Sequence, residues 1–259
     1  MDNFYKINLD KKIILITGGY GYLGKAISYS LQGHGGRVYV LGKDVKKFDM
    51  EFQNTENIVF QYCDISQTQS IIEAFSCIYK KEGRIDVLIN NACYLGKNPN
   101  KFLSDNDWEE GVRGTLSSTY TCMREIFPYF REQKGGKIIN VSSMYGVVAP
   151  DFSVYEQAVE YTNPPHYEAA KAGVIQLSRY YASYYGKLGI LVNTVTPGPF
   201  PSQAVQKNVA FIEELRKKTC LGRVGDPKDI AGVFIFLSSD AANFITGQNF
   251  VVDGGWTAK

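Results

Sequence analysis

The stretch Thr17-Gly18-Gly19-Tyr20-Gly21-Tyr22-Leu23-Gly24 follows the short apolar segment Ile13–Thr17 and decides the fold. Glycine lets the backbone turn tightly and approach a ligand closely. A pyrophosphate fits at the start of the following helix, where free N–H groups and the helix dipole favour anions. The helix itself is indicated by apolar residues spaced along one face, at Leu23, Ala26, Ile27 and Leu31. The stretch therefore predicts a strand–turn–helix unit that binds a dinucleotide.

Strand and helix patterns alternate along the rest of the chain. Further short apolar segments that predict strands lie at 38–41, 58–63, 87–90, 137–142, 190–195 and 250–252. This alternation is typical of a parallel sheet with helices on both faces. No repeat or linker interrupts it, so we expect one doubly wound α/β domain over residues 1–259. Two segments, 147–166 and 199–219, fit no regular element and are expected to form the substrate loops.

Composition limits the classes of function. The chain has 28 Lys and Arg against 26 Asp and Glu, which argues against nucleic acid or a membrane surface as the main partner. The N-terminal segment MDNFYKINLDKK is polar, and the five cysteines are scattered without a C-x-x-C pair. We therefore expect reduced thiols and a cytoplasmic location. With only two histidines and no ligand spacing, we expect no metal site.

A tyrosine and a lysine point to proton chemistry. Tyr167 and Lys171 are four residues apart in a segment that predicts a helix beginning at Tyr167, so they share one helix face. There the ammonium can lower the pKa of the phenol, since a positive charge favours the phenolate. A phenol tuned in this way can exchange a proton with an alcohol near neutral pH. The serine pair Ser142-Ser143 precedes them at the end of a predicted strand.

The order of these motifs resembles the short-chain dehydrogenase/reductase family over nearly the whole chain, in its short branch. The likeness also rests on Asn90-Asn91-Ala92, Ile139–Ser143, Pro197-Gly198, Ile245–Gln248 and Val252–Gly255. The resemblance implies an NAD(P)-dependent enzyme that interconverts a secondary alcohol and a ketone, and that forms a homodimer or homotetramer. It implies that Tyr167 is the acid or base, that Ser143 rather than Ser142 holds the reacting oxygen, and that Lys171 binds the nicotinamide ribose.

The same resemblance assigns the cofactor contacts. These are Gly18, Tyr20, Gly21, Tyr22, Leu23, Gly24, Lys43, Asp64, Ile65, Asn91, Ala92, Tyr167, Lys171, Pro197, Gly198 and Ser202. Gly42 stands where NAD-dependent members carry an acidic residue, and Lys43 follows it, so NADP(H) is expected to be preferred over NAD(H). Asp44 leaves NAD(H) open, because a shift of one residue would restore a carboxylate.

The sequence departs from the family pattern at three positions. Tyr22 replaces a glycine, which gives the turn the spacing of the longer branch that acts on nucleotide sugars. Thr115 stands seven residues after Trp108, where the family has an asparagine that organises a proton-relay water. Thr115 is therefore the fourth candidate catalytic residue. Cys93 follows Ala92 in place of glycine, and we expect it to be a small core residue.

The segment between Ser143 and Tyr167 is longer than is common in the family and suggests the substrate. It begins and ends beside the reacting centre, and its aromatic, amide and carboxylate side chains suit a polyhydroxylated ring. We expect Ser143, Tyr145, Tyr155 and Glu156 to contact a sugar or sugar nucleotide. The segment resembles that of members associated with bacterial surface-glycan and flagellin modification. A surface or subunit contact for the segment, a 3-oxoacyl thioester substrate, and a regulator without catalysis remain alternatives.

Overall fold

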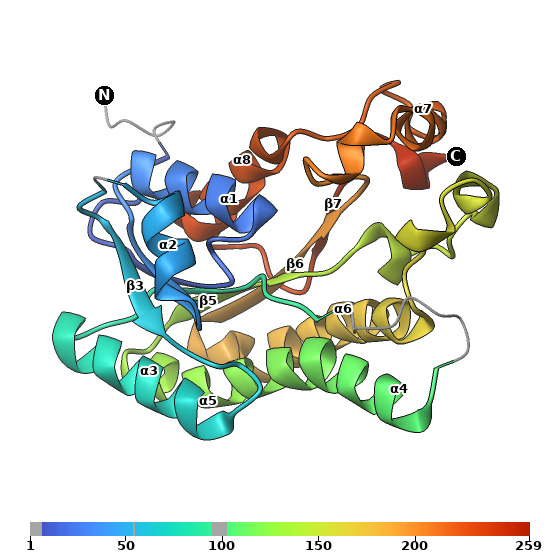
Figure 1. Cartoon of the computed structure of the whole chain (residues 1–259). Helices are drawn as coiled ribbons and strands as arrows, with labels where there is room; N and C mark the ends of the chain where they lie inside the picture. Colours follow the sequence, from blue (N-terminus) through green and yellow to red (C-terminus); the bar gives the residue numbers. More distant parts are fainter. Residues whose placement is uncertain (1–6, 54, 95–102) are drawn as a thin grey trace.

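The computed structural model describes residues 7–53, 55–94 and 103–259, so the first part of the polar N-terminal segment lies outside it. Within the described residues, seven parallel strands form one sheet in the order β3-β2-β1-β4-β5-β6-β7 (Figure 1). The strands are β1 (Ile13–Thr17), β2 (Arg37–Gly42), β3 (Ile58–Tyr62), β4 (Val87–Asn90), β5 (Gly136–Val141), β6 (Ile190–Pro197) and β7 (Asn249–Val252). The predicted strands are confirmed, with boundary differences of one or two residues.

Helices cover both faces of the sheet (Figure 1). On one face lie α1 (Tyr22–Gly33), α2 (Val45–Glu51) and α8 (Pro227–Ser238). On the other lie α3 (Thr68–Glu82), α5 (Ser118–Glu132) and α6 (Pro165–Tyr185), with α4 (Asp105–Val112) leading into α5. The predicted doubly wound α/β fold is therefore confirmed.

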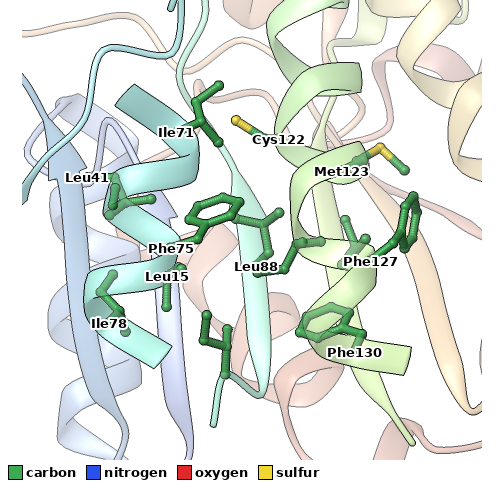
Figure 2. Close-up of a cluster of buried hydrophobic side chains, with 14 of the residues drawn as sticks. Leu15, Leu41, Ile71, Phe75, Ile78, Leu88, Cys122, Met123, Phe127 and Phe130 are labelled. Carbon is green, nitrogen blue, oxygen red and sulfur yellow. The ribbon is translucent and has the colours of Figure 1, made fainter. Parts of the chain in front are cut away.

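Each face of the sheet has its own apolar core, because successive strand side chains point to opposite faces. In β1, Ile13 and Leu15 belong to one core while Ile14 and Ile16 belong to the other. Figure 2 shows the first core, in which Leu15, Leu41 and Leu88 of the strands pack against the helices α3 and α5. The helices contribute Ile71, Phe75, Ile78, Cys122, Met123, Phe127 and Phe130.

The strand order changes direction between β1 and β4. Along the sequence, β2 and β3 are added on one side of β1, and β4 is then added on its other side. In open parallel sheets, ligands bind beyond the carboxyl ends of the strands at such a point. The glycine turn after β1 and the Asn91-Ala92 segment after β4 both lie there.

The two segments expected to lack regular structure are partly ordered. Residues 147–166 form 3₁₀ turns at Phe152–Tyr155 and Val159–Tyr161, and α6 begins at Pro165, two residues before the predicted start. Proline is suited to the first helical position because its missing N–H has no intrahelical partner there. Residues 199–219 contain α7 (Val209–Lys218), whose N-cap Asn208 accepts a hydrogen bond from the Phe211 N–H.

Candidate active site

The glycine turn after β1 forms a cradle with no room for side chains. Gly18 has a φ of +63°, a left-handed conformation that favours glycine, and a Cβ added at Gly24 would overlap the carbonyl oxygen of Gly18. The Asn91 side chain holds the turn from β4 by donating to the carbonyl oxygens of Thr17 at 3.0 Å and Gly18 at 3.1 Å.

The helix that follows the turn is open to an anion. No side chain caps its N-terminus at Gly21, and its first turn carries no acidic residue. The first N–H groups of a helix have no intrahelical partner, so a pyrophosphate can accept hydrogen bonds from them. These features fit the dinucleotide that the sequence predicts.

Three adjoining cavities form one cleft along the carboxyl edge of the sheet. We call them the ribose cavity, of about 520 Å³, the central cavity, of about 420 Å³, and the outer cavity, of about 440 Å³. Gly18, Tyr20, Ala92 and Cys93 line both the ribose and central cavities. Ser143, Tyr167, Gly198 and Phe200 line both the central and outer cavities.

The cleft gathers the residues assigned to the cofactor. Those that line the central cavity include Gly18, Tyr20, Gly21, Tyr22, Leu23, Gly24, Asn91, Ala92, Tyr167, Lys171, Pro197 and Gly198. Lys43, Asp64 and Ile65 line the ribose cavity. Ser202 differs from this pattern, because it lines the outer cavity.

Ser143, Tyr167 and Lys171 meet where the central and outer cavities join. Lys171 is 3% exposed, and its ammonium donates to the carbonyl oxygen of Val141 at 2.7 Å. The same ammonium lies 5.6 Å from the centre of the Tyr167 ring. This arrangement fixes the lysine between the end of β5 and the phenol, where it also borders the cofactor cradle.

The two neighbouring serines have different surroundings. The Ser142 hydroxyl donates to the Lys171 carbonyl oxygen at 2.8 Å and is buried, so it ties β5 to α6. Ser143 lines the central and outer cavities beside Tyr167. Its oxygen accepts a hydrogen bond from the Tyr145 N–H at 3.2 Å. Ser143 is therefore the serine that borders both the central and the outer cavities.

Burial raises the pKa of Tyr167, because desolvation disfavours the phenolate, while its hydrogen bond with Ser143 acts in the opposite direction. This direction is opposite to the lowering expected from Lys171. The pKa of Lys171 is itself lowered by burial. A phenol with a raised pKa stays protonated at neutral pH, which suits the donation of a proton to a developing alkoxide.

Thr115 and Cys93 differ from their predicted environments. The Thr115 hydroxyl exchanges hydrogen bonds with the backbone of Tyr94, donating to its oxygen at 3.1 Å and accepting from its N–H at 3.3 Å. It lies in the π-helical turn Arg113–Ser117 and lines none of the three cavities. Cys93 is exposed and lines the cleft, so its prediction as a core residue is wrong. The cleft passes directly over the end of β4, which leaves the thiol uncovered.

The predicted substrate residues separate into two groups. Tyr145 and Tyr155 are buried at the outer cavity, where their hydroxyl groups hydrogen-bond to each other. Glu156 is exposed and lies outside the cavity walls, because the 3₁₀ turn that ends at Tyr155 directs the chain away. The carboxylate that lines the cavity belongs to Glu160.

Sequence reasoning also missed residues that join the two loop segments. Phe211 and Leu215 of α7 line the outer cavity together with the segment after β6. Lys218 of α7 pairs with Asp151 at 2.6 Å, which holds residues 147–166 against residues 199–219. No local sequence pattern signals these contacts, since each depends on how the two segments meet.

The ribose cavity has a mixed charge pattern. The Lys43 ammonium lies 3.5 Å from Asp64, and the Lys43 side chain is 63% exposed. The Asp44 carboxylate accepts a hydrogen bond from the Lys47 N–H at 3.0 Å and thereby caps α2. Asp44 is thus committed to the helix, whereas the Lys43 ammonium extends toward solvent.

The fold and this cleft define a dinucleotide-binding oxidoreductase, in which a bound nicotinamide cofactor would supply or accept a hydride. Ser143 can hold a carbonyl oxygen and Tyr167 can give it a proton. Residues 22–257 match the family model described as Enoyl-(Acyl carrier protein) reductase. The chain belongs to the short-chain dehydrogenase/reductase family.

The chain is similar to relatives with different named activities. It is 34% identical to the 7alpha-hydroxysteroid dehydrogenase of Bacteroides fragilis, over 96% of this chain and 95% of the relative. It is 30% identical to the post-translational flagellin modification protein A of Campylobacter coli, over 96% and 99%. Relatives of this similarity thus span several substrate classes.

A solved short-chain dehydrogenase from Leptospira borgpetersenii with bound NAD+ has a TM-score of 0.86 and 31% identity, and covers 98% of this chain and 95% of its own. Another similar structure, a gluconate 5-dehydrogenase from Burkholderia cenocepacia, is in complex with NADP and tartrate. The chain is therefore an NAD(P)-dependent oxidoreductase with a small-molecule substrate. This finding argues against the alternative of a regulatory protein without catalysis. Among the described residues, no helix is long and apolar enough to cross a membrane.

Proposed function

We propose that the chain interconverts a secondary alcohol and a ketone on a sugar or a related polyol. The observation that carries this proposal is the outer cavity beside Ser143 and Tyr167. Its walls combine aromatic rings with polar groups, namely Tyr145, Tyr155, Tyr161, Phe200 and Phe211 with Glu160, Thr162, Asn163 and Ser202. Rings offer flat faces to a sugar, while its hydroxyl groups need fixed hydrogen-bond partners.

One wall group has unused hydrogen-bonding capacity. The Thr162 hydroxyl is buried and has no hydrogen-bond partner within the described part of the protein. Buried polar groups are normally paired, so an unpaired hydroxyl at a cavity wall favours a substrate that carries hydroxyl groups.

Charge favours a neutral substrate. Among the described residues that line the outer cavity, Glu160 is the charged one, and none is Lys or Arg. An anionic substrate such as a sugar nucleotide would therefore meet a carboxylate without a basic partner. We accordingly place a neutral keto sugar or polyol ahead of a sugar nucleotide.

In the reductive direction, Ser143 holds the carbonyl oxygen and Tyr167 donates its proton to that oxygen. Lys171 keeps the phenol in place from the cofactor side, since its ammonium is anchored on Val141. Thr115 is tied to Tyr94, so we assign it a role in holding the loop after β4. Tyr145, Tyr155 and Glu160 form the substrate wall, and Glu156 is left out of it.

We further propose that NADP(H) is preferred. Asp44 caps α2, so the carboxylate that would suit NAD(H) is engaged, while Lys43 offers a point charge to a 2′-phosphate. Replacing Lys43 with alanine should raise the dissociation constant for NADP+ more than that for NAD+. Calorimetric titration of both cofactors measures this, and tighter binding of NAD+ by the unaltered protein would refute the preference.

A 3-oxoacyl thioester is the second candidate substrate. Met144, Val205 and Leu215 give the outer cavity an apolar portion that an acyl chain could contact. The description of the matching family model, an enoyl-acyl carrier protein reductase, names another acyl thioester, which is reduced at a carbon–carbon double bond and not at a ketone. The 30% identity to a flagellin modification protein selects no substrate, because identity to a hydroxysteroid dehydrogenase is 34%.

A substrate screen tests the proposal directly. Purified protein is mixed with reduced cofactor and neutral keto sugars, sugar nucleotides or 3-oxoacyl thioesters, and the nicotinamide absorbance is followed. The Tyr167→Phe variant is the matched control for background oxidation. Turnover of neutral keto sugars above the other two classes supports the proposal, and turnover of thioesters alone contradicts it.

We also propose that the enzyme is a cytoplasmic homodimer or homotetramer. The cysteines in the described residues are all free thiols, which fits a reducing compartment. Exposed tyrosines gather on α5 and α6, including Tyr120, Tyr180 and Tyr184. Light scattering on the purified protein measures the mass, and a monomer at micromolar concentration would contradict the assembly.

A further inference from the structure

A tyrosine occupies the place that an acidic side chain would take at the end of β2. A Cβ added to Gly42 would overlap the Tyr20 hydroxyl group and ring. Tyr20 comes from the glycine turn after β1, and its ring lies against the end of the neighbouring strand. A side chain at position 42 and the Tyr20 ring would occupy the same space, so the observed place of Tyr20 requires a glycine at position 42.

The Tyr20 oxygen is already used as an acceptor. It accepts hydrogen bonds from the backbone N–H of Lys43 at 3.1 Å and, more weakly, from that of Asp44 at 3.4 Å. A hydroxyl group whose lone pairs face two N–H groups has its own proton left to donate. A carboxylate in the same place could only accept.

Two lysine side chains lie near Tyr20. The Lys47 ammonium lies 5.6 Å from the centre of the Tyr20 ring. The Lys43 side chain lines the same cavity as Tyr20 and pairs loosely with Asp64, at 3.5 Å. Asp44, the nearest other carboxylate in sequence, caps α2 instead.

We propose that Tyr20 is a specificity-determining residue that recognises the 2′-phosphate of the cofactor through its hydroxyl proton. The group at the 2′ position of the cofactor must be matched by a hydrogen-bond donor or acceptor of the protein. A ribose 2′-hydroxyl can donate to a carboxylate, whereas a 2′-phosphate only accepts and favours a donor hydroxyl with ammonium groups in the same region. This inference rests on the proposed function, since it concerns the cofactor of that same site.

The chain thus differs in chemistry from a site that carries an acid at the end of β2. The residue that recognises the 2′ position comes from the glycine turn after β1. The end of β2 contributes only the space left by Gly42 and the N–H groups of Lys43 and Asp44. Lys43 and Lys47 supply positive charge, and the Tyr20 hydroxyl supplies a directional hydrogen bond. Removing the hydroxyl should therefore affect only ligands that carry the 2′-phosphate.

Binding of nucleotide fragments tests the inference without turnover. Adenosine 2′,5′-bisphosphate and 5′-ADP are titrated by calorimetry into the unaltered protein, Tyr20→Phe and the control Tyr62→Phe. Tyr62 pairs in register with Gly42, is exposed, and lies outside the three cavities. The Tyr20→Phe change should weaken the 2′-phosphorylated ligand about tenfold, a factor equal to about 1.4 kcal/mol, because hydrogen bonds to charged groups are the strong ones.

The same titrations decide whether the Tyr20 hydroxyl recognises the 2′-phosphate. We expect 5′-ADP to bind Tyr20→Phe as it binds the unaltered protein, and Tyr62→Phe to change neither ligand. Equal weakening of both ligands in Tyr20→Phe, or unchanged binding of the bisphosphate, would overturn the inference while leaving the oxidoreductase in place. Binding of neither NADP+ nor NAD+ by the unaltered, folded protein would instead remove the proposed function.

A second substitution checks the shared space between the two positions. Gly42→Asp should expel the Tyr20 hydroxyl and place a carboxylate there, so binding of adenosine 2′,5′-bisphosphate should fall by more than tenfold, beyond the loss in Tyr20→Phe, as charge repulsion is added. Circular dichroism verifies that the variant is folded. Retained preference for the 2′-phosphorylated ligand in a folded Gly42→Asp protein would contradict the role of Tyr20.

Discussion

Replacing the adjacent serines one at a time should separate catalysis from folding. Ser143→Ala removes a hydroxyl that faces both the central and outer cavities, beside Tyr167. Loss of one donor to a developing oxyanion typically lowers kcat by about 10²–10³-fold. We therefore expect a loss of that size in Ser143→Ala, with the dissociation constant of the cofactor unchanged.

Ser142→Ala should behave in the opposite way. Its buried hydroxyl donates to the Lys171 carbonyl oxygen at 2.8 Å, and a hydrogen bond of this kind contributes about 0.5–1.5 kcal/mol to stability. For a chain of this length, that loss should lower Tm by roughly 2–4 °C per kcal/mol. The kcat should stay within a factor of a few, because the Ser142 hydroxyl is engaged by the Lys171 carbonyl oxygen, although Ser142 also lines the central cavity.

Two measurements on each variant decide between the serines. Steady-state rates with a substrate from the screen give kcat, and thermal unfolding gives Tm. Ser143→Ala also loses the hydrogen bond from the Tyr145 N–H, so a small decrease in its Tm is expected. If Ser142→Ala lost kcat by 10²-fold or more while Ser143→Ala stayed active, the assignment of Ser143 to the reacting oxygen would be refuted.

Further predictions concern the proton donor, the outer wall and the half-buried carboxylate of Glu168. Tyr167→Phe should lower kcat by about 10²–10⁴-fold while calorimetry shows cofactor binding unchanged, and near-normal turnover would contradict the mechanism. Because the pKa of Tyr167 is raised by burial, alcohol oxidation, which needs the phenolate, should accelerate as pH rises above neutral. A pH–rate profile for oxidation that is flat up to pH 10 would speak against this. Glu160→Gln should raise KM for a keto sugar, whereas Glu156→Gln, outside the cavity, should not; equal effects would remove Glu160 from the wall. Burial raises the pKa of Glu168 from 4.5 to about 7, so the folded state binds more protons than the unfolded state between these values. Stability should therefore fall as pH rises from 4.5 to 7, and Glu168→Gln should lack this decrease in urea titrations at the two ends of the range. An identical pH dependence in both proteins would contradict the burial of this carboxylate.

The sequence predicts the sheet well because its signals are local and repeated. β1 and β4 coincide with their predicted ranges, and both are short continuous apolar runs, as strands buried on two faces require. β6 extends two residues beyond its prediction, to Pro197, because Thr196 and Pro197 pair with β7. That extension depends on a partner more than fifty residues away, which no local pattern reveals.

The candidate site is predictable where it depends on backbone and order, and less so where it depends on side chains from distant segments. Gly18 and Gly24 are needed by the turn itself, so their spacing alone indicates the cradle. Glu156 and Glu160 are four residues apart in a segment without periodicity, and the sequence offers no means to choose between them. The 3₁₀ turns at Phe152–Tyr155 and Val159–Tyr161 make that choice.

Thr115 shows how a contact elsewhere can override an expectation from position. Its place seven residues after Trp108 suggests a side chain that holds a proton-relay water. The π-helical turn at Arg113–Ser117 instead brings its hydroxyl to the backbone of Tyr94. The preceding residue, Gly114, lies against the Tyr94 side chain, so the whole turn packs on the segment after β4. A family position thus predicts where a residue lies, but not which hydrogen bond it makes.

Tyr167 and Lys171 illustrate the same limit in electrostatics. The spacing of the two residues correctly places the ammonium near the phenol, 5.6 Å from the ring centre. The sequence does not reveal that Lys171 is buried and the Tyr167 phenol largely desolvated, or that the ammonium is held by the Val141 carbonyl oxygen at 2.7 Å. Burial penalises the phenolate and the ammonium alike, so the pKa of Tyr167 rises and that of Lys171 falls. The protonated phenol that results is matched to an alkoxide, a strong base that appears only as a carbonyl is reduced. The raised pKa therefore keeps the Tyr167 phenol in the protonated form, which is the form that can donate a proton.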